Sequence, residues 1–290
     1  MPGKDKKRQE KITCDALRQT VQQAFDRIRD PRRANVSYAL TEMRGSAFAR
    51  FWLKCPSLLS FDERTKAEDG NLKNLDRIAT VPSDPPMRAA LDPVLPAPLR
   101  QVFRTLFETL QSAGVIKEYH FWRDHVIVTV DGVEHFASRK SHCDHCCQRP
   151  LRDGTTAYCH AGLGAVLDPP ADEAVLPRDF EPILKPDGAQ KNDGERSAAK
   201  RLCAALAARY PDLKIILVED ALYANAPHVR QMQEHGWHFI LNVKPDSHAS
   251  LEKQFAGRRA TGQGRAGRAT FLRLDERLVP ERQRHSRDRQ

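Results

Sequence analysis

The sequence predicts an α+β protein, in which an all-helical N-terminal region precedes a mixed β-sheet joined by helices. As far as residue 115, apolar side chains recur about every 3.6 residues, the period of an amphipathic helix. From Glu118 onward the period changes to about 2, which is typical of strands. We therefore expect a helical region over residues 1–115, a sheet domain over residues 116–255 and a separate tail over residues 256–290.

The composition narrows the class of protein. A chain of 290 residues with 40% hydrophobic residues can bury one large core or two modest ones. No apolar run approaches the roughly 20 residues of a membrane span, so we expect no membrane partner. The basic N-terminus has no apolar stretch behind it, which argues against a secretory signal. Seven cysteines without such a signal favour reduced thiols or a metal over disulfides, and we expect a cytoplasmic protein.

The positive charge is concentrated at the two ends of the chain. Residues 256–290 contain ten arginines against four acidic residues, and residues 1–12 contain five basic residues against two acidic ones. These two ends account for the whole net charge of +9. Basic ends suit nucleic acid, but they are equally typical of solvated, disordered tails, and charge alone does not separate the two interpretations.

Three segments of the N-terminal region carry apolar faces at helical spacing, namely residues 1–30, 36–54 and 99–110. Pro56 and the acidic pair Asp62-Glu63 indicate a break after the second segment, and residues 84–98 are rich in proline. No group of residues in this region implies chemistry.

The sheet domain begins with residues 126–130, where alternating valines predict a strand. Asp131-Gly132 follows, and its commonest meaning is a tight turn into a second strand over residues 133–137. Alternatively, Asp131 is a carboxylate held at the end of a rigid strand, where it could bind a metal. Residues 155–167 predict a third strand, which would complete an antiparallel meander. Proline-rich, irregular chain is then expected as far as Gly188.

The second half of the domain alternates helices with strands. Asp193 is a plausible N-cap of a helix, and the apolar residues 213–218 suit a strand covered on both faces. Asn225 and Gly236 delimit a second helix, which precedes a final strand over residues 237–243. The expected order of elements is three strands, a helix, a strand, a helix and a strand. This is the ribonuclease-H-like order, in which the first and fourth strands lie side by side.

That order brings two aspartates together. Asp131 lies at the end of the first strand and Asp220 just beyond the fourth, so we expect their carboxylates within about 8 Å of each other. Two such carboxylates repel each other unless a cation lies between them, and their hard oxygen atoms select Mg²⁺ or Mn²⁺. A pair of these ions about 3.5–4 Å apart cuts or joins nucleic acid strands.

Three segments then make the chain recognisable as one that resembles the DDE transposases of bacterial insertion sequences. They are VTVDGVEHFASRKSHCDHC around Asp131, KNDGERSAAKRL at residues 191–202, and VEDALYANAPHVRQMQEHGWHFILNVK at residues 218–244. The similarity covers roughly residues 36–255. It implies DNA transposition by metal-dependent nicking at the transposon ends, followed by attack of the freed 3′-hydroxyl on target DNA. The implied partner is DNA, and the resemblance allows a homodimer.

The resemblance carries Asp131 and Asp220 over as the first two carboxylates of the catalytic triad. The third is normally a glutamate on a later helix, but the chain departs from the pattern after Phe255 and becomes arginine-rich, as a truncated or frameshifted end would. Glu276 and Glu281 are the formal candidates there. We therefore expect an incomplete catalytic domain with impaired cleavage. A non-catalytic DNA-binding remnant, or a zinc-binding interaction module, is the alternative function.

A cysteine group offers a second kind of site. Cys143 and Cys146, followed by Cys159 and His160, are the ligand types of a tetrahedral zinc site. The alternative is a loop of reduced thiols, some of them merely buried.

Other polar residues near the motifs have simpler roles. Asp193, Glu195 and Arg201 lie in a family-like motif, but helix capping and helix pairing explain them better than catalysis does. His135, His142 and His145 are expected on solvated strand ends or in the cysteine loop.

Overall fold

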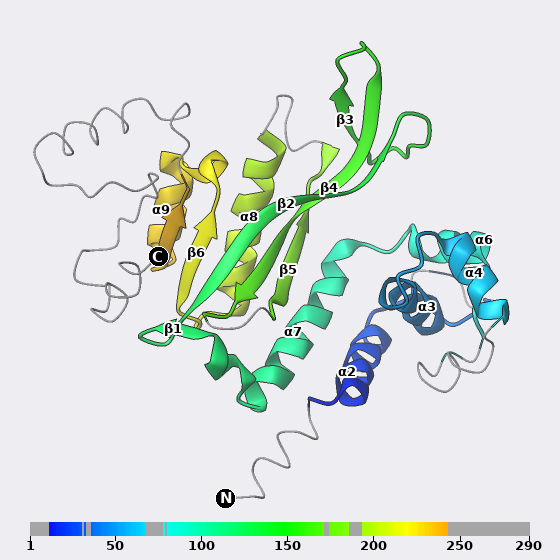
Figure 1. Cartoon of the computed structure of the whole chain (residues 1–290), viewed down its shortest axis with the longest axis horizontal. Helices are drawn as coiled ribbons and strands as arrows, with labels where there is room; N and C mark the ends of the chain where they lie inside the picture. Colours follow the sequence, from blue (N-terminus) through cyan, green and yellow to red (C-terminus); the bar gives the residue numbers. More distant parts are fainter. Residues whose placement is uncertain are drawn as a thin grey trace, which may run out of the picture. The chain divides into compact units, whose positions relative to one another are not determined.

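The computed structural model describes residues 12–30, 32, 36–67, 78, 80–170, 174–185 and 193–242. The chain divides into two compact units between Val115 and Ile116. The first is helical and the second contains the β-sheet, so the predicted α+β class is confirmed (Figure 1). Both basic ends, including Glu276 and Glu281, lie outside the described residues. No helix in these ranges is long and apolar enough to cross a membrane.

The first unit contains five described helices: α2 (Cys14–Asp26), α3 (Leu40–Trp52), α4 (Leu58–Ala67), α6 (Asp84–Leu91) and α7 (Pro96–Ser112). Two of them correct the sequence prediction. The expected break at Asp62-Glu63 is wrong, because both residues lie inside α4. The proline-rich segment forms α6, since Pro85 and Pro86 occupy the first turn, where a helix needs no backbone N–H donor.

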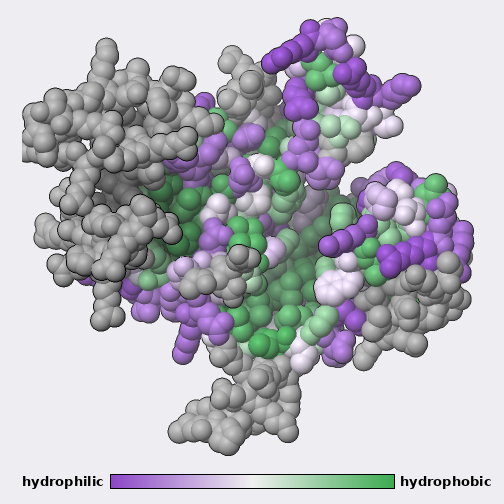
Figure 2. Space-filling model, viewed as in Figure 1, coloured by the Kyte–Doolittle hydropathy of each residue, from purple (hydrophilic) through white to green (hydrophobic). Residues whose placement is uncertain are grey.

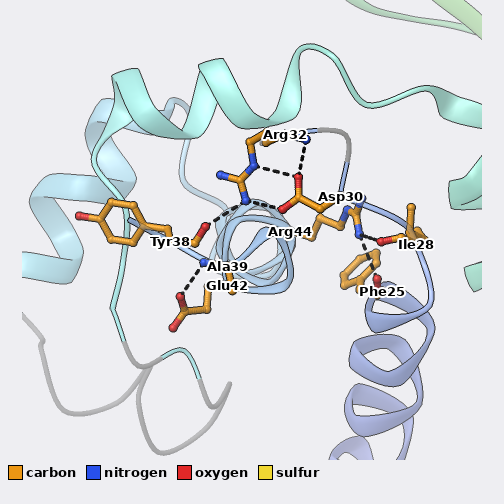
Figure 3. Close-up of polar contacts among 8 residues, drawn as sticks. All are labelled: Phe25, Ile28, Asp30, Arg32, Tyr38, Ala39, Glu42 and Arg44. Carbon is orange, nitrogen blue, oxygen red and sulfur yellow. Dashed lines mark hydrogen bonds and ion pairs between the residues drawn. The ribbon is translucent and has the colours of Figure 1, made fainter. Parts of the chain in front are cut away.

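A buried arginine joins α2 to α3 in the first unit (Figure 3). The Nη1 atom of Arg44 donates to the carbonyl oxygens of Phe25 and Ile28, at 2.9 and 3.1 Å, where α2 ends. Arg44 is only 4% exposed, and this burial lowers its pKa, an effect that Asp30 partly opposes. Asp30 is held by Arg32, which donates to both carboxylate oxygens. The end of α2 therefore depends on side-chain donors as well as on apolar packing.

The sheet of the second unit has seven strands: β1 (His120–Trp122), β2 (His125–Ser138), β3 (Cys147–Pro150), β4 (Thr156–Asp168), β5 (Leu176–Pro182), β6 (Ile215–Glu219) and β7 (His238–Leu241). Their order is β3-β4-β2-β6-β7, with β1 paired to β2 and β5 paired to β4. The pairs made by β6 are parallel, and the other pairs are antiparallel. The sheet is therefore mixed, as predicted.

Strand β2 is continuous through Asp131-Gly132, so the turn expected there is wrong. Asp131 pairs with Gly164 and Gly132 with Leu163, and the ladder with β4 extends to Ser138, with one irregularity between Glu134 and Phe136. The alternating valines of β2 are almost completely buried, as expected. A long partner strand satisfies the backbone of β2 on both sides of Gly132, which outweighs the local preference of Asp-Gly for a turn.

Strand β5 lies in a segment that was expected to be irregular. Its sequence, LPRDFEP, hides the strand because charged residues and prolines replace the alternating apolar pattern. Three of these charged side chains, Arg178, Asp179 and Glu181, are buried. They pair with α8 and its end: Arg209 binds Asp179, Arg201 Nε donates to Glu181 Oε1 at 2.6 Å, and the guanidinium of Arg178 stacks on Tyr210. Burial lowers the pKa of Arg178 to about 10.

Helix α8 (Asp193–Arg209) packs against β4 and β5, and the 3₁₀ turn η3 (Ala221–Tyr223) follows β6. Helix α9 (Ala226–Glu234) is capped as predicted: Asn225 Oδ1 accepts from the His228 backbone, and Gly236 follows with φ of 70°. Apolar side chains of α8 and β6, among them Leu202, Leu206 and Leu217, are almost fully buried. This core holds the end of β6, and with it Asp220, in place.

The Arg44 interactions give a prediction for stability. Arg44→Met keeps much of the packing volume but removes both donors at the end of α2, so the free energy of unfolding should fall by about 1–3 kcal/mol. Urea denaturation followed by circular dichroism measures the change. Arg104→Met is the control, because its exposed pair with Glu108 on α7 contributes at most about 0.5 kcal/mol. Equal stability of the two variants would contradict this role for Arg44.

Candidate functional site

Asp131 lies midway along β2, and Asp220 directly follows the end of β6, the parallel strand beside it. Strands β2 and β6 pair from Val126 with Ile215 to Thr129 with Val218. Asp131 and Asp220 each follow the last pair by two residues, and Asp220 keeps an extended backbone, with φ of −80° and ψ of −178°. Since neighbouring strands lie about 4.8 Å apart, the two residues stand side by side on the same face. The structure thus brings together the two aspartates that the sequence singled out.

Each aspartate is oriented by its own backbone. The N–H of Gly132 donates to Asp131 Oδ1, and the N–H of Leu222 donates to Asp220 Oδ1, both at 2.8 Å. Both side chains are exposed. These hydrogen bonds hold one oxygen of each carboxylate, and the other oxygen can accept a cation.

A third carboxylate, Glu195 in the first turn of α8, joins this pair. A Cβ atom placed on Gly132 would lie 3.5 Å from the carboxylate carbon of Glu195, so Glu195 rests directly against β2 at Gly132, the residue that follows Asp131. Burial raises the pKa of Glu195, and the charges of Asp220 and Asp131 raise it further. Both aspartates are therefore near enough to Glu195 for their charges to act on it. Sequence reasoning preferred capping for Glu195; the KNDGERSAAKRL motif and the glycine opposite it were the available signals.

Tyr223 lies beneath this carboxylate group. Its side chain is 2% exposed. Its hydroxyl acts on the carboxylate of Glu195 and lowers the pKa of that group, which partly opposes the rise caused by burial and by the aspartates. Burial raises the pKa of Tyr223, and the carboxylates of Glu195, Glu219, Asp220 and Asp131 raise it further, in that order. Tyr223 is therefore a neutral hydrogen-bond donor surrounded by acidic groups. Its sequence position, three residues after Asp220, is part of the family-like segment.

A buried hydrogen-bonded pair, His228 and Glu219, stabilises the end of β6. His228 Nε2 and Glu219 Oε2 are 2.6 Å apart, and the ligand atoms of both lie within 4.8 Å of the Cys203 sulfur. Burial raises the pKa of Glu219, and its hydrogen bond with His228 partly opposes this shift. The pair ties the end of β6 to the first turn of α9. It thereby fixes the turn that carries Asp220 and Tyr223.

The structure also places the other residues that the sequence singled out. Cys143, Cys146 and His160 converge, while Cys159 projects from the opposite face of β4, since adjacent residues of a strand alternate. Arg201 is committed to Glu181 and to the carbonyl of Pro182. Asp193 begins α8, but its side chain lies outside the described residues. The three histidines that the sequence placed at strand ends or in the cysteine loop, His135, His142 and His145, are all exposed.

Comparisons with known proteins do not assign this chain to a family. No protein-family model matches the sequence, and no curated protein is significantly similar to it. The chemistry of the site must therefore be argued from its residues.

The raised pKa of Glu195 predicts how metal-free stability depends on pH. The folded state binds the Glu195 proton more tightly than the unfolded state, whose pKa is near 4.5. The stabilisation that comes from the protonated Glu195 is fully present below pH 4.5. It is lost as the pH rises through the raised pKa of Glu195 in the folded state. At neutral pH, Glu195→Gln should therefore melt at a higher temperature than the parent protein without metal, whereas at about pH 4 the two should converge.

The measurement is thermal denaturation across this range, with and without Mg²⁺. Added Mg²⁺ should stabilise the parent protein and not Glu195→Gln, because ligands stabilise the state that binds them. Asp212→Asn is the control, since Asp212 is exposed before the opposite end of β6. A lower melting temperature for Glu195→Gln at neutral pH would show that Glu195 is not crowded by the two aspartates.

Proposed function

We propose that the second unit is a ribonuclease-H-like catalytic domain of a DDE-type transposase, which cleaves and joins DNA strands with Asp131, Asp220 and Glu195 as its metal-binding carboxylates. The observation that carries the proposal is that Asp131 in β2, Asp220 after β6 and Glu195 in the first turn of α8 lie near one another. The parallel pairing of those strands supports the ribonuclease-H-like assignment. The resemblance of the surrounding segments to insertion-sequence transposases supplies the reaction.

The residues fit a pair of divalent cations. Burial and the charges of Asp220 and Asp131 raise the pKa of Glu195, an effect that a cation would offset, and Mg²⁺ or Mn²⁺ prefers carboxylate oxygen ligands. When bound, such a metal pair activates the attacking oxygen and stabilises the leaving one.

The protein's own groups have distinct tasks in this site. Asp131 and Asp220 are held by backbone N–H donors, so their free oxygens are oriented before any ligand arrives. Glu195 approaches from α8 on the other side of Gly132 and closes the ligand set. Tyr223 stays protonated because burial and the surrounding carboxylates raise its pKa, so it can donate a hydrogen bond but does not act as a base at neutral pH.

This proposal differs from the expectation that the chain lacks a third carboxylate. In the resembling family that residue is expected downstream of Phe255, where the sequence departs from the pattern. Glu195 lies upstream, between the two aspartates in sequence, and it reaches the site because α8 packs on β4 and β5 with its first turn beside β2. The alternative function, a DNA-binding remnant without catalysis, follows if Glu195 cannot replace the downstream residue.

The experiment is a strand-cleavage assay with the full chain, Mg²⁺ or Mn²⁺, and DNA that carries the terminal sequences flanking its gene. Asp131→Asn, Asp220→Asn and Glu195→Gln should each lower the cleavage rate by about 100-fold or more. Asp212→Asn should cleave at the parental rate. Titration of Mn²⁺ should show binding to the parent protein that Glu195→Gln weakens.

Two outcomes would contradict the proposal in different ways. Parental cleavage that survives Glu195→Gln but not Asp220→Asn would place the third ligand elsewhere, and Glu276 and Glu281 would be tested next. A parent protein that binds DNA in a salt-sensitive manner without cleaving it, and that binds no Mn²⁺, would establish the remnant.

A further inference from the structure

The second cluster of ligand atoms lies away from the carboxylates, in the part of the sheet formed by the distal half of β2, strand β3 and the first half of β4. We refer to residues 133–160 as the β-arm. We propose that Cys143, Cys146 and His160 bind one Zn²⁺ ion, which joins the loop between β2 and β3 to strand β4. Thiolate and imidazole ligands select zinc over magnesium, so this site is independent of the proposed catalytic metals.

The distances match a tetrahedral site. The sulfur atoms of Cys143 and Cys146 are 3.7 Å apart, and each lies 3.3 Å from His160 Nε2. Zinc bonds of about 2.3 Å to sulfur and 2.1 Å to nitrogen place tetrahedral ligands about 3.8 Å apart for two sulfurs and about 3.6 Å apart for sulfur and nitrogen. A disulfide would instead bring the two sulfurs to about 2.05 Å. The three atoms therefore surround a position of the right size for the ion.

The backbone of the loop is shaped to present both sulfurs. The N–H of Cys146 donates to the carbonyl of Cys143 at 3.2 Å, which closes a tight turn over the C-x-x-C segment. The N–H of Cys143 points at the sulfur of Cys146, at 3.4 Å. This N–H fixes the orientation of the Cys146 sulfur.

The β-arm has little else to hold it together. In Figure 1, β2 and β4 run on past the central sheet and carry β3 at their far end. On the face shown in Figure 2, that end is mostly hydrophilic, with only scattered apolar residues. Among the β-arm side chains that the structure describes, Cys146, Ala157 and Cys159 are the buried ones. Small units without an apolar core commonly use a structural metal instead.

The remaining cysteines of the β-arm provide internal controls. The Cys147 sulfur is directed at the carbonyl oxygen of Ile183, at 3.6 Å, and Cys159 lies on the other face of β4. Three protein ligands leave one tetrahedral position, which either water or a fourth side chain fills. The ring of His135 stacks on that of His160 with centroids 6.0 Å apart, so His135 is the neighbouring imidazole to test for this position.

The test is the metal content of the full-length protein, purified after expression in zinc-supplemented medium and measured by mass spectrometry. The parent protein should hold one zinc per chain. The variants Cys143→Ser, Cys146→Ser and His160→Ala should each lose most of it, while Cys147→Ser should keep it. Cobalt substitution should add thiolate-to-metal charge-transfer absorption to the parent protein and not to Cys143→Ser/Cys146→Ser. His135→Ala shows whether the fourth ligand is a side chain or water.

Two further measurements keep a loss of metal from being mistaken for unfolding. Circular dichroism should show that the double cysteine variant retains its helices, since none of them lies in the β-arm. Asp220→Asn should hold zinc at the parental level, because the carboxylate site is separate. Parent protein without stoichiometric zinc or cobalt binding, or metal retained by the double cysteine variant, would overturn the proposal.

Discussion

The parallel pairing of β2 with β6 is the constraint on which the rest of the second unit depends. Four residue pairs set its register, and that register decides that Asp131 and Asp220 emerge at the same level. A slip of one residue would turn one carboxylate to the opposite face of the sheet. The buried side chains of β6 and the Glu219–His228 hydrogen bond hold β6 against such a slip. The apolar core of this unit thus determines the geometry of its polar site.

Burial makes the charged forms of the acidic groups at the site less stable, and a bound cation would offset this free-energy cost. Glu195, Tyr223 and Glu219 all have raised pKa values, and burial is the first cause for each. Burial of this kind is unfavourable for charged groups unless they are paired. Shifted pKa values of this kind are common at functional sites, where a bound ligand can offset the unfavourable burial of the acidic groups. The raised values are thus a physical reason to expect a ligand there, independent of any resemblance.

The features that the sequence revealed were those with strong local patterns. The alternating valines of β2, the apolar run of β6 and the Asn225 cap each follow from a few neighbouring residues. The Asp131-Gly132 turn was mispredicted because its partner strand lies more than 30 residues away. Strand β5 was missed because ion pairs with α8 replace the usual apolar alternation. The place of Glu195 also depends on tertiary contacts, which no local pattern contains.

The continuity of β2 has a consequence for communication along the molecule. The strand carries Asp131 in its middle, and Phe136, five residues further on, pairs with His160 of the cysteine cluster. At about 3.3 Å per residue, the two proposed ion sites are separated by about 17 Å, roughly twice the screening length of physiological salt. Neither site therefore senses the charge of the other. What connects them is a single stiff backbone, interrupted by one irregularity between Glu134 and Phe136, so any influence between them is mechanical.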